Sequence, residues 1–125
     1  MSYKKRVDLF IECVYKYVKM FNLGNYDIEI LGTNDKDVYG QCRWFRYEDG
    51  TKSANIYFSK PWLQRTKNVT VHEIKKAAFH EVCELLLAEL NQIAHERFIE
   101  EREIIKSVHE IIGRLEFLAT EKGFL

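Results

Sequence analysis

The sequence predicts an α+β fold with an N-terminal helix, a small antiparallel sheet of about three strands, and two long antiparallel helices. Chain breakers gather in the first half: the only proline is Pro61, and four of the six glycines precede it. Residues 62–112 contain neither glycine nor proline, so this stretch is expected to be helical. The length of 125 residues suits a single domain, which we expect to span residues 1–125.

An amphipathic helix is expected at the start of the chain. Its apolar residues recur at intervals of three and four, which places them on one helical face. They are Val7, Phe10, Ile11, Val14, Val18 and Phe21. Gly24 is the expected stop, since glycine readily adopts the left-handed conformation that ends many helices.

Three strands are expected before the proline. Residues 26–30 alternate between apolar and polar side chains, as a half-buried strand does. Residues 39–47 and 53–58 flank an Asp-Gly pair, which is a strong hairpin signal. The last strand is expected to place alternate residues on opposite faces, with Ala54, Ile56 and Phe58 on one and Asn55 and Tyr57 on the other.

Two helices are expected after the proline. Thr70 and Glu73 match a capping box, so a helix should begin near Val71. A single helix reaching residue 112 would have no partner in so small a domain, which predicts a break between Asn91 and Phe98. The apolar face of the last helix is expected to comprise Ile104, Ile105, Val108, Ile111, Ile112, Leu115 and Leu118.

Composition excludes several classes of protein. Lys and Arg number 19, as do Asp and Glu, and this net charge of 0 argues against a nucleic-acid partner. No run of about 20 apolar residues predicts a membrane span, and Asp8 and Glu12 interrupt a start that would otherwise resemble a signal peptide. The three cysteines form no C-x-x-C pair, so a zinc ribbon or a disulfide framework is not indicated and a cytoplasmic location is expected.

One stretch of the long helical region carries a motif for zinc chemistry. His80 and Glu84 are four residues apart, so they lie on the same helical face, and both types of side chain bind zinc. Glu81 lies beside them, where it can act as a general base. All four histidines precede a glutamate, but only His80 has a potential ligand four residues later. The alternative is a solvated carboxylate beside a hydrogen-bonded histidine.

A third ligand is available on the last helix. A helical hairpin centred between residues 96 and 97 would place Glu84 opposite His109, which lies among inward-facing apolar residues. Two histidines and one carboxylate are typical of a catalytic zinc site. Periodicity alone favours the other interpretation, a core histidine bonded to a carbonyl oxygen. Charge distribution supports a cation site, because residues 73–103 contain eight acidic and four basic side chains.

The sequence resembles the minimal zincin metallopeptidases, in particular the small ones encoded by phages and prophages. The resemblance covers most of the chain. It is carried by residues 22–30 after the first helix, by the Ala-x-Ile-x-Phe strand, by Phe-His-Glu-Val-Cys-Glu-Leu-Leu-Leu at residues 79–87, and by His-Glu-Ile-Ile-Gly-Arg-Leu-Glu at residues 109–116. The sequence departs from the family at Glu84, where the zincin motif H-E-x-x-H has its second histidine.

This resemblance implies a site and an activity. It implies that His80 is the first zinc ligand, Glu81 the general base and Glu84 the replacement for the second ligand. His109 corresponds to the third ligand, with Glu110 as the alternative. It also implies an edge strand that binds extended protein or peptide substrate, for which Ser53 to Phe58 is the candidate, and hydrolysis of peptide bonds by zinc-activated water.

Two other functions remain open at this point. The chain can be a zincin-like binding module that has lost or weakened its metal site and holds a protein partner in the same cleft. Such a module can also use aromatic residues of the hairpin, which are Tyr39, Trp44, Phe45, Tyr47 and Tyr57. Contact with nucleic acid through the basic residues is the least favoured function, because surface lysines and arginines usually form a solvated face.

Overall fold

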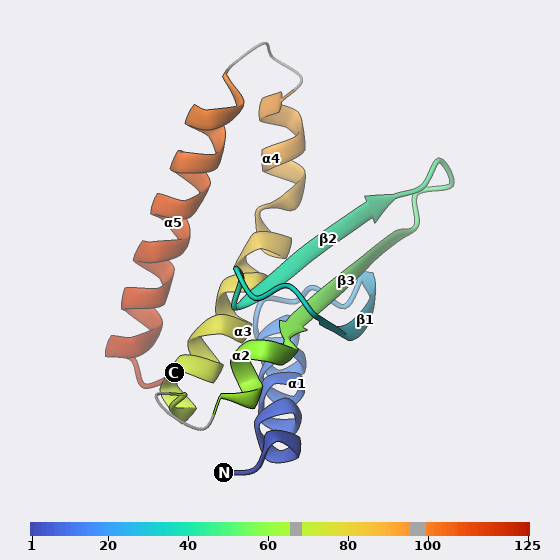
Figure 1. Cartoon of the computed structure of the whole chain (residues 1–125). Coiled ribbons are helices and arrows are strands. Elements are labelled where there is room, and N and C mark those ends of the chain that lie inside the picture. The colour runs from blue at the N-terminus through green and yellow to red at the C-terminus, as the bar shows by residue number, and fades with distance from the viewer. Residues whose placement is uncertain (66–68, 96–99) are drawn as a thin grey trace.

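The computed structural model describes residues 1–65, 69–95 and 100–125 (Figure 1). The elements in chain order are α1 (Tyr3–Met20), β1 (Tyr26–Thr33), β2 (Gly40–Arg46), β3 (Lys52–Ser59), α2 (Lys60–Gln64), α3 (Val71–Leu86), α4 (Ala88–His95) and α5 (Glu101–Glu121). The α+β class predicted from the sequence is therefore confirmed. Among these residues, no helix combines the length and the apolar character that crossing a bilayer requires.

The sheet is mixed, and the prediction of a wholly antiparallel sheet is wrong. Its strand order is β1-β3-β2. The predicted hairpin pairs β2 with β3 in antiparallel fashion, but β1 runs parallel to β3, from Tyr26 opposite Lys52 to Thr33 opposite Ser59. Strand β3 takes the centre because its inward face is the most deeply buried, with Ala54 and Ile56 both fully inaccessible. Side-chain alternation reveals a strand but not its direction.

The central position of β3 also corrects the expected site of substrate binding. The strand from Ser53 to Phe58 lies within β3 and is paired along both edges. Its backbone groups are already hydrogen-bonded, so it cannot be the edge strand to which an extended peptide is added. The strands at the edges of this sheet are β1 and β2.

The first helix ends at Met20, four residues before the glycine expected to stop it. Asn22 adopts the left-handed conformation, with φ of 56°. The Asn22 N–H donates to the carbonyl of Lys19 at 3.1 Å, and the Leu23 N–H donates to that of Val18 at 2.9 Å. These two bonds form a Schellman motif, in which asparagine takes the position usually held by glycine. Gly24 therefore lies outside the cap.

Short helix α2 was not expected, whereas the start of α3 was. The hydroxyl oxygen of Ser59 accepts from the Trp62 N–H and caps α2. At α3, Thr70 and Glu73 form the predicted capping box. Helix α3 ends at Leu86, and after a break at Leu87 the chain continues as helix α4. Helix α4 ends at His95, which lies between Asn91 and Phe98, where a break was predicted. The predicted centre of the hairpin, between residues 96 and 97, lies outside the described residues.

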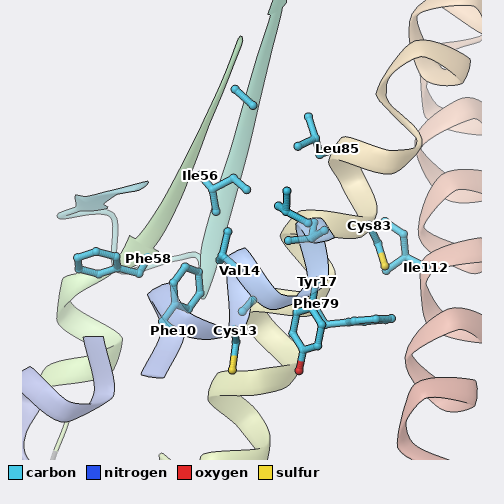
Figure 2. Packing of buried hydrophobic residues seen from close by; sticks show 14 of the residues in the cluster. Phe10, Cys13, Val14, Tyr17, Ile56, Phe58, Phe79, Cys83, Leu85 and Ile112 are labelled. Carbon is cyan, nitrogen blue, oxygen red and sulfur yellow. The ribbon is translucent and has the colours of Figure 1, made fainter. Parts of the chain in front are cut away.

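The core lies between the sheet and the helices behind it. Helix α3 packs against β2 and β3, and α1 packs against α3 and reaches the sheet where Phe10 meets Phe58, with ring centres 5.9 Å apart. Ile112 is fully buried and brings α5 into the same cluster. Figure 2 shows Ile112 pointing toward Cys83 of α3. This packing fixes α5 alongside α3, as Figure 1 shows.

We predict that Ile112→Ala lowers the free energy of unfolding by about 2–5 kcal/mol, because a buried isoleucine leaves a cavity. Ile105→Ala on the same helix is the matched control, since Ile105 is 42% exposed. Its cost should stay below about 1 kcal/mol. Urea denaturation followed by far-ultraviolet circular dichroism measures both changes. Equal losses in the two variants would show that α5 does not dock through Ile112.

Candidate metal centre

The residues predicted to form the site come from two neighbouring helices. His80, Glu81 and Glu84 lie on α3, and His109 lies on α5. Atom Oε1 of Glu84 is 3.2 Å from Nε2 of His109 and 3.5 Å from Nε2 of His80. One ligand atom from each of these three residues lies within 4.8 Å of the other two. The fold thus brings together the three side chains that the sequence suggested as metal ligands.

Two of the three separations between these atoms suit a tetrahedral zinc ion. Two zinc bonds of about 2.0–2.2 Å that meet at about 109° hold their ligand atoms roughly 3.3–3.6 Å apart. The two observed separations, 3.2 and 3.5 Å, are close to this value. The donor set of two imidazoles and one carboxylate also fits zinc, and it leaves the fourth coordination position free, as catalytic zinc sites do.

The structure distinguishes the two candidates for the third ligand. The side chain of His109 is 51% exposed and its ring nitrogen contacts Glu84, so the interpretation of His109 as a core histidine is wrong. Glu110 is exposed on α5 and does not belong to the cluster found among the described residues. One residue step turns a helix by about 100°, which points Glu110 away from α3.

The pKa values of Glu84 and His80 are shifted in opposite directions at this site. Burial tends to raise the pKa of Glu84, but contacts with His80 and His109 outweigh burial and lower it. The pKa of His80 is raised to about 10, first by Glu116 and then by Glu84. His80 therefore carries a proton at neutral pH when no metal is bound. A metal ion must displace that proton, because only the neutral imidazole is a ligand.

Glu81 differs from its neighbour Glu84 in its surroundings. It is 5% exposed, and burial, followed by the nearby charge of Glu84, raises its pKa to about 8. A carboxyl group whose pKa lies near neutrality is suited to accept and return a proton. Gly40 at the start of β2 makes room for it: a Cβ there would lie 3.0 Å from both Cγ and Oε2 of Glu81.

A cleft of about 730 Å³ opens beside these residues. His80 and Glu81 line one end, together with Glu116 from α5. The cleft continues along α3 to Glu73 and is bounded on the other side by the start of β2 and by α2. Two aromatic rings, Tyr39 and Trp62, pack against each other at this wall, with centres 5.1 Å apart and planes inclined at 56°. Of the three residues in the cluster, His80 lines this cleft, whereas Glu84 and His109 lie outside its lining.

Two residues near the site were not singled out from the sequence. Glu116 lies 3.7 Å from His80, measured from Oε2 to Nδ1. It follows His109 by seven residues, and this spacing of two helical turns was a usable signal that the two share a face. Gly40 had no such signal, because its role depends on how closely β2 approaches α3.

Comparison with known proteins gave no assignment: no family model matches the chain, and neither a curated protein nor a solved structure matches it. The likeness to zincins thus has only the motif and the geometry described above to support it.

We predict that Gly40→Ala lowers the free energy of unfolding by about 1–3 kcal/mol, because the added methyl group crowds Glu81 and the carbonyl of Tyr57. Gly113→Ala is the matched control. Gly113 lies inside α5 with open space around it, so alanine there should raise stability by about 0.5–1 kcal/mol. Chemical denaturation measures both. A neutral or stabilising Gly40→Ala would mean that β2 does not press on Glu81.

Proposed function

We propose that this protein is a zinc-dependent metallopeptidase of the minimal zincin type, with Glu81 as its general base. The observation that carries the proposal is the convergence of His80, Glu84 and His109, from two helices, beside a buried carboxyl group at the end of a cleft. Structural zinc sites close all four positions with protein ligands, whereas three ligands and a neighbouring carboxyl group suit hydrolysis.

The proposed roles follow from the position of each group. Zinc held by His80, Glu84 and His109 would supply a Lewis acid that activates water and polarises a carbonyl group. The carboxylate of Glu81 accepts a proton from the attacking water at one of its oxygens and returns it to the nitrogen of the leaving amine. Burial of Glu81 keeps bulk water from competing for that proton.

Glu84 changes the charge of the proposed site. A zinc ion with two neutral imidazoles and one carboxylate retains a net charge of +1, compared with +2 for three imidazoles. The smaller charge makes a weaker Lewis acid, but it also stabilises the bound cation directly. A carboxylate is an ordinary zinc ligand, so this departure from the zincin motif is compatible with catalysis.

We place the substrate along β2. Its outer edge has no partner strand in the described sheet, and Gly40 at its start lies against Glu81. An extended peptide can form backbone hydrogen bonds with such an edge. The peptide bond to be cleaved would then lie in the cleft beside His80. This replaces the strand of residues 53–58, whose edges are both occupied.

One observation favours a second function, a zincin-like module that binds protein without metal or catalysis. The cluster is electrically satisfied without a cation, since Glu84 contacts both His80 and His109. Such a cluster can persist as a polar network in a protein that no longer binds zinc. Metal content and turnover separate the two functions.

We predict that protein purified without chelators contains about one equivalent of zinc, and that His80→Ala and Glu84→Ala remove it. His72→Ala is the control, because His72 is an exposed histidine on the same helix. Zinc at 100 times its Kd should raise the free energy of unfolding by about 2.7 kcal/mol. Elemental analysis and thermal denaturation measure these effects. Absence of zinc together with absence of a thermal shift would contradict the enzyme proposal.

We predict that Glu81→Gln keeps the zinc but lowers peptide hydrolysis by about 10²–10⁴-fold, because the amide cannot accept the proton. Turnover of a quenched fluorescent peptide library measures the loss. Glu121→Gln, an exposed change on α5, is the control. Loss of zinc from Glu81→Gln would make Glu81 a ligand. A zinc-loaded wild type without turnover would favour the binding module.

A further inference from the structure

The imidazole of His80 has a carboxylate on each side. Its Nε2 atom faces Oε1 of Glu84 at 3.5 Å, and its Nδ1 atom faces Oε2 of Glu116 at 3.7 Å. The side chain of Glu116 is only 15% exposed. Glu84 already has a role as a proposed ligand, whereas no step of the proposed reaction uses Glu116.

The chemistry of a histidine ligand gives Glu116 a role. Neutral imidazole carries one N–H and one lone pair, and the lone pair must be on the nitrogen that binds the metal. If Nε2 of His80 binds zinc, Nδ1 must carry the hydrogen. Histidine ligands in proteins usually donate that second N–H to a carboxylate, a carbonyl oxygen or water, which fixes the ring.

We propose that Glu116 is a positioning residue that accepts a hydrogen bond from Nδ1 of His80 and so directs the Nε2 lone pair to the metal. The inference rests on the proposed metal site. The present separation of 3.7 Å is longer than a direct hydrogen bond, and a movement of about 0.5–1 Å by the flexible glutamate side chain makes the bond.

Helix α5 is placed to supply both groups. His109 and Glu116 are seven residues apart, so they lie two turns apart on the same face, toward α3. On α3, the facing residues are Glu84 and His80, one turn apart. One docked helix therefore provides the third ligand and the carboxylate that orients the first.

Glu116 is not placed to be a fourth ligand. It approaches the side of the His80 ring that faces away from Glu84, with the imidazole between them. The coordination position needed for water therefore stays free. If Glu116 contacts Nδ1 of His80, it is also clear why Glu116 lines the cleft but does not belong to the ligand cluster.

The test compares zinc affinity in wild type, Glu116→Leu, Glu116→Gln and Glu121→Gln, by competition with a chromophoric chelator. Glu116→Leu should weaken zinc binding by about 10–100-fold, because the second N–H loses its acceptor. Glu116→Gln should weaken zinc binding less than Glu116→Leu does, because the uncharged amide oxygen of glutamine still accepts the hydrogen bond. Glu121→Gln, with its exposed side chain on the same helix, should bind zinc as wild type does.

Nitrogen-15 NMR of the histidine rings gives a readout that a purely structural role would not move. In zinc-loaded wild type, His80 should show a protonated Nδ1 whose hydrogen is protected from exchange with water, and that protection should fall in Glu116→Leu. Folding of each variant is checked by circular dichroism, and Glu116→Gln, the nearer isostere, decides the matter if Glu116→Leu does not fold.

The outcomes separate this inference from the proposed function. A wild type that binds no zinc overturns the proposed function and this inference with it. A wild type that binds zinc, with affinities of the folded Glu116 variants within twofold of it, overturns only the role of Glu116. Graded weakening from glutamine to leucine supports both.

Discussion

The packing of α5 against α3 is the interaction on which the candidate site depends. Without it, α3 alone presents His80 and Glu84, and two ligands do not make a catalytic zinc site. The contact is apolar at its centre, with Ile112 fully buried and Val108 nearly so. Burying such side chains stabilises by about 1.5–3 kcal/mol each. This gain offsets the cost of holding Glu84 and Glu116 partly out of water beside the helix contact.

Glu81 and Glu84 lie on the same turn of α3, but their surroundings shift their pKa values in opposite directions. Glu81 points toward β2, where burial raises its pKa, whereas Glu84 points toward two imidazoles, which lower its pKa. A pair of carboxyl groups divided in this way can take separate tasks, one as a proton carrier and one as a permanent anion. The close approach of Gly40 maintains the difference, because it seals Glu81 from solvent without a side chain.

Local signals in the sequence were sufficient for α1, for the start of α3, for α5 and for the ligand cluster, but not for α2 or the break at Leu87. The capping box at Thr70 and the four-residue spacing of His80 and Glu84 are properties of a single helix, and hairpin symmetry then brought His109 into place. Features that depend on tertiary structure could not be predicted from the sequence. Alternation in β1 is the same in a parallel and an antiparallel sheet, and Asn22 ended α1 because its backbone could adopt the left-handed conformation before Gly24 was reached.

Glu84 also holds the candidate site together in the absence of a metal ion. A single oxygen of its carboxylate faces both histidines, at 3.2 and 3.5 Å. A histidine at that position would add a third imidazole and would remove the carboxylate that contacts both of the other two. The carboxylate therefore holds His80 and His109 close together without a metal ion, and its contact with His80 would have to give way if the proposed zinc ion displaced the proton of His80. In the proposed zinc site, the charge of Glu84 would thus both hold the ligands together in advance and oppose the change that metal binding requires.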